Sequence, residues 1–159
     1  MRTAEHESVL SPADMSSLLA LEATGFPVRE RWSAHSWQAE LQTPSRRGFA
    51  VRDGRTVVAA CLVSVLLGEA ELLRIVVDPA QQGRGIGRRL LDEGTRWACS
   101  RGARRMLLEV REDNTAARRL YAATGFTQIH RRENYYGPDK DALVLARTLA
   151  PGVTEEEYA

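Results

Sequence analysis

The segment 82–87 constrains the fold of this chain more than any other stretch. It reads Gln-Gly-Arg-Gly-Ile-Gly, follows an apolar, strand-like run at 72–77 and opens a helix predicted over 86–100. A glycine-rich turn between a strand and a helix points several backbone N–H groups in one direction, and the helix dipole adds partial positive charge there. Further positive charge comes from three arginines, Arg84, Arg88 and Arg89. The segment therefore predicts a strand–turn–helix unit that holds a phosphate-bearing ligand.

Two well-known phosphate motifs do not fit this segment. A nucleoside-triphosphate loop ends in Gly-Lys-Ser/Thr, which is missing here, and the dinucleotide fingerprint G-x-G-x-x-G is one residue longer than the spacing from Gly83 to Gly87. The turn also lies in the middle of the chain, whereas the fingerprint belongs to an opening βαβ unit. The remaining pattern, Q-x-x-G-x-G from Gln82 to Gly87, is typical of the pyrophosphate loop of acetyltransferases that use acetyl-CoA. A tight turn without a ligand is the alternative that this motif alone leaves open.

Length and charge limit the class of protein. We expect 159 residues to form one domain over 1–150, followed by an acidic, disordered tail at 151–159. The 22 basic and 21 acidic residues nearly balance, which argues against nucleic acid or an anionic membrane as a partner. No signal-peptide core is present, and the longest apolar run, 57–68, is too short to cross a bilayer. We expect a cytoplasmic protein, as a monomer or a weak homodimer.

Metal chemistry is not expected either. The histidines are scattered, and the two cysteines, Cys61 and Cys99, lack the C-x-x-C spacing of a metal or redox site. Both cysteines lie in apolar surroundings, which is typical of buried, reduced thiols.

Hydrophobic periodicity predicts an alternation of strands and helices. The expected strands are 5–10, 48–52, 56–66, 71–77, 104–110, 126–132 and 142–149, and the expected helices start at Ser11, Ser33, Ile86 and Asn114. The order is β-α-α-β-β-β-α-β-α-β-β. It predicts an α/β fold in which a mixed sheet carries helices on both faces.

A second motif lies on the helix predicted after Asn114. It reads Asn114-x-x-Ala117-x-x-x-Tyr121-x-x-x-Gly125-Phe126, and together with the glycine loop it resembles the Gcn5-related N-acetyltransferase (GNAT) superfamily over 9–149. The pieces Leu-Glu-Val-Arg at 108–111 and Asn-Tyr-Tyr at 134–136 are similar to the bacterial RimI group. That resemblance implies an acetyl-CoA-dependent acyltransferase with the GNAT fold.

The resemblance also implies an acceptor. Enzymes of the RimI group acetylate the N-terminal alanine of the eighteenth small-subunit ribosomal protein, so a protein N-terminus is the expected partner. A GNAT enzyme for a small amine, such as a polyamine or an antibiotic, and a non-catalytic CoA-binding subunit are the alternatives. The chain departs from the group's pattern at Arg31, where proline is usual, at Gly83, where arginine is common, and within Ala59–Ala60. Because Arg31 lies near the expected peptide groove, its presence leaves the acceptor open.

Acetyl transfer to an amine needs a base and an acid. A free α-amine has a pKa of about 8, so much of it is protonated and unreactive at neutral pH. Glu109 is a carboxylate in an otherwise apolar strand, where desolvation would raise its pKa, and it matches the group's general base. A solvent-facing position or a pair with Arg111 is the alternative. Tyr121 matches the group's general acid, which protonates the departing CoA thiolate, and an ordinary core tyrosine is its alternative.

The resemblance assigns the remaining site residues. The cofactor-binding residues would be Ile75, Val76, Val77, Gln82, Gly83, Arg84, Gly85, Ile86, Gly87, Arg88 and Asn114. The backbone of 75–77 would hold the pantetheine arm and polarise the thioester carbonyl, while Asn114 would also cap its helix. The acceptor would meet Glu22, Phe26, Trp32, Tyr135 and Tyr136. Each aromatic could equally be a packing residue, and Glu22 could simply be solvated.

Overall fold

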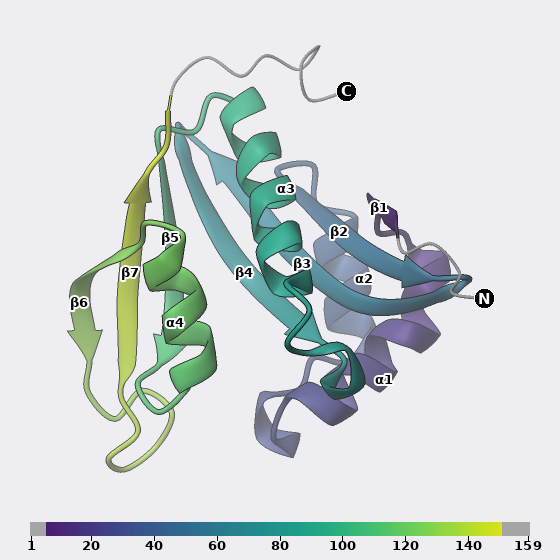
Figure 1. Cartoon of the computed structure of the whole chain (residues 1–159), viewed down its shortest axis with the longest axis horizontal. Coiled ribbons are helices and arrows are strands. Elements are labelled where there is room, and N and C mark those ends of the chain that lie inside the picture. The colour runs from purple at the N-terminus through teal and green to yellow at the C-terminus, as the bar shows by residue number, and fades with distance from the viewer. Residues whose placement is uncertain (1–5, 151–159) are drawn as a thin grey trace. The chain divides into compact units, whose positions relative to one another are not determined.

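The computed structural model describes residues 6–150 (Figure 1), so the tail predicted at 151–159 lies outside the described residues. Two compact units make up this part of the chain. The first contains 6–64 and 74–94, and the second contains 65–73 and 95–150. The single domain expected over 1–150 stays a prediction.

The order of helices and strands is the one predicted from the sequence. In chain order they are β1 (His6–Val9), α1 (Met15–Gly25), α2 (Ala34–Leu41), β2 (Arg46–Asp53), β3 (Thr56–Leu66), β4 (Glu69–Val77), α3 (Ile86–Ser100), β5 (Arg105–Arg111), α4 (Thr115–Ala123), β6 (Thr127–Arg132) and β7 (Ala142–Thr148). Strand β4 begins earlier than predicted because Leu67 and Gly68, both at positive φ, form a two-residue turn directly before it. Among the helices of 6–150, none combines the length and the hydropathy that a bilayer crossing requires.

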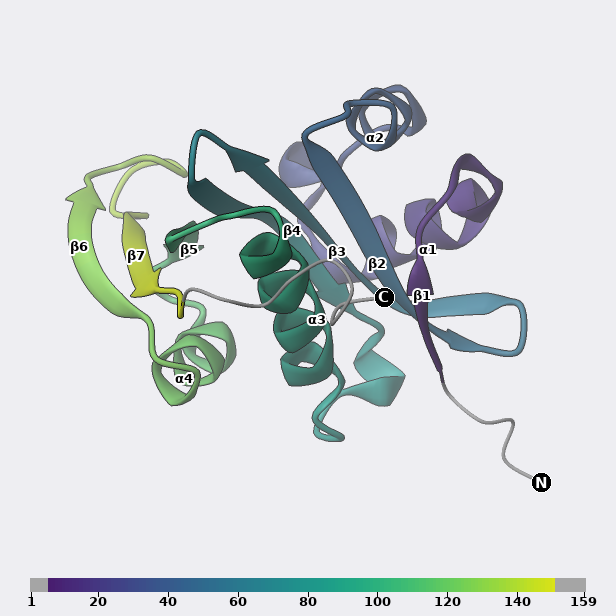
Figure 2. The same cartoon turned by 90° about the horizontal axis from the view of Figure 1, so that it is seen from above.

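In the first unit, helices cover both faces of an antiparallel sheet. Strands β1, β2 and β3 pair antiparallel, and the end of β4 follows β3 in the strand order. Figure 2 shows α1 and α2 on one side of β2 and β3, and the start of α3 on the other. Close contacts fix both layers, since a Cβ at Gly48 would lie 3.1 Å from Leu41 of α2, and one at Gly94 of α3 would lie 2.7 Å from Val63. Glycine at these positions therefore allows the helices to approach the strands.

The second unit contains the strand order β4-β5-β7-β6. The start of β4 runs parallel to β5, while β7 pairs antiparallel with both β5 and β6. Although strand β5 is largely apolar in sequence, its residues after the exposed Arg105 alternate between buried and half-buried, because only one of its faces is packed into the core. The second cysteine, Cys99, is likewise only partly buried, in contrast to Cys61. Helix α4 contributes Tyr121 to this core, where its ring packs edge-on against Phe126 at 5.7 Å.

Candidate functional site

The glycine loop between β4 and α3 has a backbone that requires glycine. Gly83 and Gly85 have φ of 81° and 75°, in the left-handed region that other residues adopt only with strain. Helix α3 starts immediately afterwards, and its first backbone bond runs from the N–H of Arg89 to the carbonyl of Gly85 at 3.1 Å. The strand–turn–helix unit predicted from the sequence is therefore present.

Backbone N–H donors cluster in this loop. In the described part of the chain, no protein acceptor is recorded for the N–H groups of Gly83, Gly85, Ile86 and Gly87. Such orphan N–H groups carry the positive end of the helix dipole and attract anions. Arg84 and Arg88 are exposed beside them, and Arg84 donates to the Gln81 side chain at 2.5 Å. The loop can therefore bind an anionic group such as a pyrophosphate.

Side chains of the β4 segment at 75–77 belong to the core of the first unit. Val76 is buried, and a Cβ on Gly25 of α1 would lie only 2.5 Å from its Cγ2. Ile75 and Val77 are half-buried. The predicted cofactor contacts of this segment use its backbone, which leaves the side chains free for packing.

A buried ion pair contacts the residues of the α1–α2 loop that were predicted to meet the acceptor. The Glu22 side chain is 2% exposed, and its oxygens accept from Nη2 and Nε of Arg74, the latter at 3.2 Å. Glu22 also accepts the Trp32 N–H at 2.6 Å, and Arg74 donates to the Glu30 carbonyl at 2.7 Å. The guanidinium carbon of Arg74 lies 3.5 Å from the ring centre of Phe26 and 4.7 Å from that of Trp32. These contacts hold the α1–α2 loop on the β4 strand.

Arg74 was not among the residues predicted from the sequence, although a signal was available. It is a charged residue in the otherwise apolar run 72–77, the same signal that singled out Glu109. The sequence placed Glu22 near a positive acceptor group, whereas the positive group that Glu22 meets in the structure is Arg74. Arg31, where the family usually has proline, donates to the carbonyls of Phe26 at 2.9 Å and Ala23 at 3.0 Å. It therefore caps the end of α1 and stiffens the same loop.

Glu109 lies on β5 in the second unit, opposite Val144 of β7. Its carboxylate is half-buried, with 24% of the side chain exposed, and Oε1 lies 3.1 Å from Nε of Arg132. The pair with Arg111 that the sequence left open does not form, since Arg111 binds Asp113 at 3.1 Å. Within residues 6–150, no partner is recorded for Oε2 of Glu109. The carboxylate is thus anchored through one oxygen, and the other can accept a proton.

Tyr121 and Asn114 occupy α4 of the same unit. The Tyr121 side chain is buried, as the helical spacing predicted. The side-chain oxygen of Asn114 accepts the Ala117 N–H at 3.1 Å, which confirms its role as the helix cap. The predicted roles of Tyr121 as proton donor and of Asn114 as cofactor contact stay predictions.

The two tyrosines of the β6–β7 loop contact each other and two arginines. Their rings meet edge-on at 5.1 Å. The guanidinium carbon of Arg132 lies 5.3 Å from the ring centre of Tyr135, and that of Arg111 lies 5.5 Å from the ring centre of Tyr136. Tyr135 is 52% exposed, whereas Tyr136 is partly buried. Arginine–aromatic contacts therefore connect this loop to β5 and β6.

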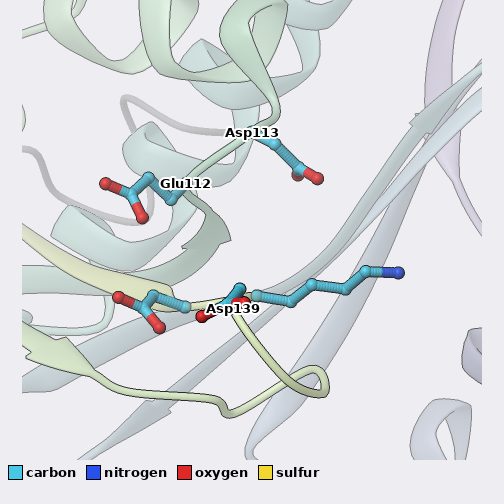
Figure 3. Close-up of a pocket in the computed structure, with 5 residues that line it drawn as sticks. Glu112, Asp113 and Asp139 are labelled. Atoms are coloured by element: carbon cyan, nitrogen blue, oxygen red, sulfur yellow. The ribbon is translucent and has the colours of Figure 1, made fainter.

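A shallow cavity of about 200 Å³ lies at the loops of the second unit, lined by Glu112, Asp113, Asp139, Lys140 and Asp141. Figure 3 shows Glu112 and Asp113 on the segment between β5 and α4, and Asp139 on the β6–β7 loop. Hydrogen bonds from Arg131 lower the pKa of Glu112, and those from Arg111 lower the pKa of Asp113. The Asn134 N–H, followed by Arg131, lowers the pKa of Asp141. These ion pairs join the two loops.

Comparisons with known proteins place the chain in a family. A model of the Acetyltransferase (GNAT) family matches residues 14–126. The N-alpha-acetyltransferase RimI of Mycobacterium tuberculosis is 40% identical over 142 residues, which cover 84% of this chain and 88% of that protein. The [Ribosomal protein bS18]-alanine N-acetyltransferase of Escherichia coli is 33% identical over 148 residues, covering 86% of this chain and 99% of that protein.

A solved structure agrees with these relatives. The crystal structure of the ribosomal-protein-S18-alanine N-acetyltransferase from Escherichia coli matches with a TM-score of 0.85 at 29% identity, over 94% of this chain and 96% of that one. The fold predicted from the sequence is thereby confirmed. Since the family model matches more than half of the chain and these relatives match most of it, the chain belongs to the acetyltransferase (GNAT) family.

Proposed function

We propose that this protein is an acetyl-CoA-dependent N-acetyltransferase that acetylates the N-terminal alanine of ribosomal protein bS18 in the cytoplasm. The observation that carries the proposal is the identity of 33–40%, over most of the chain, with enzymes named for N-α-acetylation and for bS18 alanine. The glycine loop supports the co-substrate, because it offers donors for an anion at the start of α3.

In this proposal the loop binds the pyrophosphate of acetyl-CoA. The N–H groups of Gly83, Gly85, Ile86 and Gly87 donate to its oxygens, and the exposed guanidinium groups of Arg84 and Arg88 add Coulomb attraction. The side chain of Gln82 and the cap residue Asn114 are further proposed contacts. The backbone of 75–77 holds the pantetheine arm, and an N–H of this segment polarises the thioester carbonyl.

Glu109 and Tyr121 are the proposed proton-transfer groups. Oε2 of Glu109 takes a proton from the acceptor ammonium, directly or through a water molecule. The amine nitrogen then forms a bond to the acetyl carbon while the carbon–sulfur bond breaks. The hydroxyl of Tyr121 gives its proton to the CoA sulfur, and the second amine proton leaves to solvent. A positioned base of this kind contributes roughly 10²–10⁴-fold to the rate.

The proposed acceptor surfaces are two loops. Exposed Tyr135 and its neighbour Tyr136 offer aromatic faces and hydroxyl groups on the β6–β7 loop. Phe26 and Trp32 lie on the α1–α2 loop, which Arg74 and Glu22 hold in place. A peptide can pack on such aromatic surfaces, whereas a small amine needs only the proton acceptor.

Mass spectrometry with acetyl-CoA tests the proposal. The acceptors are a peptide copying the bS18 N-terminus, the same peptide with a blocked α-amine and a free lysine, and a polyamine. We expect a gain of one acetyl group on the free α-amine of the first peptide alone. Transfer only to the polyamine would support the small-amine alternative, and CoA binding without transfer to any acceptor would support the non-catalytic one.

Variants test the proton-transfer roles in the same assay. Glu109→Gln and Tyr121→Phe should each lower kcat while leaving acetyl-CoA binding intact. Glu112→Gln is the matched control, because Glu112 is a carboxylate of the same unit that pairs with Arg131 instead. Equal rates for Glu109→Gln, Tyr121→Phe and wild type would refute the assigned mechanism.

A further inference from the structure

The proposed base is held from a strand that is not its neighbour. Glu109 of β5 and Arg132 of β6 are separated by β7, yet Nε of Arg132 lies 3.1 Å from Oε1 of Glu109. Glu109 is opposite Val144, and Arg132 is opposite Ala142. The pair therefore crosses β7 diagonally, from the position of Val144 to that of Ala142. All of these residues belong to the second unit.

An irregularity in β6 selects which arginine faces Glu109. Gln128 pairs with Leu145, but the next residue in register with β7 is His130, opposite Val144, so Ile129 is an extra residue. A β-bulge of this kind moves the following side chains to the other face of the sheet. It places Arg132 on the face of Glu109, whereas Arg131 binds Glu112 at 2.7 Å and Asp141 at 2.8 Å.

The other arginine on this face is already engaged. Arg111 is two residues from Glu109 on β5, so it points to the same side. It binds both oxygens of Asp113, at 3.1 and 3.2 Å. For the described residues, Arg132 is thus the one recorded ion-pair partner of Glu109.

We propose that Arg132 is a positioning residue for Glu109. It holds Oε1 so that Oε2 faces the incoming amine. It also links Glu109 to the β6–β7 loop, because its guanidinium carbon lies 5.3 Å from the ring centre of Tyr135. This inference rests on the proposed function, since it assigns Glu109 as the base. The chemistry of the step is unchanged: the proton still passes from the amine to Glu109.

Four variants test this role with the bS18 peptide as acceptor. Arg132→Gln should lower kcat by about 10- to 100-fold, which is the cost of misplacing a reacting group by about 1 Å. Arg132→Lys should recover part of the loss, since it keeps the cation. Arg131→Gln, at the adjacent arginine on the other face, should retain wild-type activity. The half-exposed Arg132 pair contributes little to stability, so Arg132→Gln should unfold at the wild-type temperature.

Non-additivity separates positioning from a general effect. If Arg132 acts through Glu109, adding Arg132→Gln to Glu109→Gln should slow the enzyme no further. A full additional loss in the double variant, or wild-type kcat in Arg132→Gln, would overturn the inference. If wild-type enzyme fails to acetylate the peptide, the proposed function itself is wrong. If wild type is active and Glu109→Gln is slow while Arg132→Gln is fast, only the role of Arg132 is wrong.

Discussion

Replacing Arg74 by methionine tests what holds the α1–α2 loop. The substitution keeps a long apolar stem between Phe26 and Trp32 but removes the cation that Glu22 binds. Glu22 would then be a buried carboxylate whose remaining recorded donor is the Trp32 N–H. Loss of one partner from a buried ion pair costs about 3–5 kcal/mol, mostly because the other charge remains desolvated.

The exposure of Arg74 narrows the expected free-energy cost of Arg74→Met. The Arg74 side chain is 12% exposed, so some water can reach the site and the cost should lie at the lower end, about 3 kcal/mol. The matched control is the double variant Glu22→Met with Arg74→Met, which removes both charges. It should be within about 2 kcal/mol of wild type, because apolar residues often replace a buried pair without loss.

Urea denaturation at pH 7, followed by far-ultraviolet circular dichroism, measures both free energies of unfolding. We expect a lower midpoint for Arg74→Met and recovery in the double variant, with unchanged m-values. The double variant should still raise the KM for the acceptor peptide, since the Trp32 N–H and the Glu30 carbonyl lose their partners. A single-variant cost below about 1 kcal/mol, or no recovery in the double variant, would refute the argument about desolvated charge.

Three further outcomes follow from local geometry. Gly85→Ala should weaken CoA binding about tenfold, measured by calorimetry, because an alanine in the left-handed conformation is strained by about 1–2 kcal/mol. Gly54→Ala introduces the same backbone strain in the β2–β3 hairpin and should leave CoA affinity unchanged. Hydrogen bonds from Arg52 lower the pKa of Asp14, so this pair stabilises the fold above about pH 4, and its contribution is lost as the pH falls further. Asp14→Asn should therefore lower the free energy of unfolding at pH 7. It should also make the urea midpoint less dependent on pH in the acid range. Burial raises the pKa of Cys61 to about 12, so iodoacetamide at pH 8 should not alkylate this thiol until urea unfolds the chain. Mass spectrometry detects the alkylation, and rapid labelling of Cys61 in the folded protein would contradict its burial.

Local patterns in the sequence predicted the element order, the glycine loop and the cap at Asn114. Each depends on residues close together in the chain: the left-handed glycines at 83 and 85, the side chain of Asn114 with the N–H of Ala117, and the periodicity of the helices. Most bounds differ by one or two residues, mostly where strand pairing extends a strand beyond its apolar run. The exception is α1, which starts at Met15, four residues after the predicted start at Ser11, because Pro12–Asp14 form a 3-10 turn. The family motifs followed from the same local spacing.

Tertiary structure decided which charged groups meet. Nothing local indicates that Glu22 binds Arg74, 52 positions away, because that contact depends on how the α1–α2 loop returns to β4. Likewise, the sequence offered Arg111 as the partner of Glu109, but the bulge in β6 and the register across β7 bring Arg132 there. The sequence by itself thus determined the elements and the chemical groups, since these depend on short-range propensity. Their pairing needed the fold, because strand register and loop closure set distances between residues far apart in the chain.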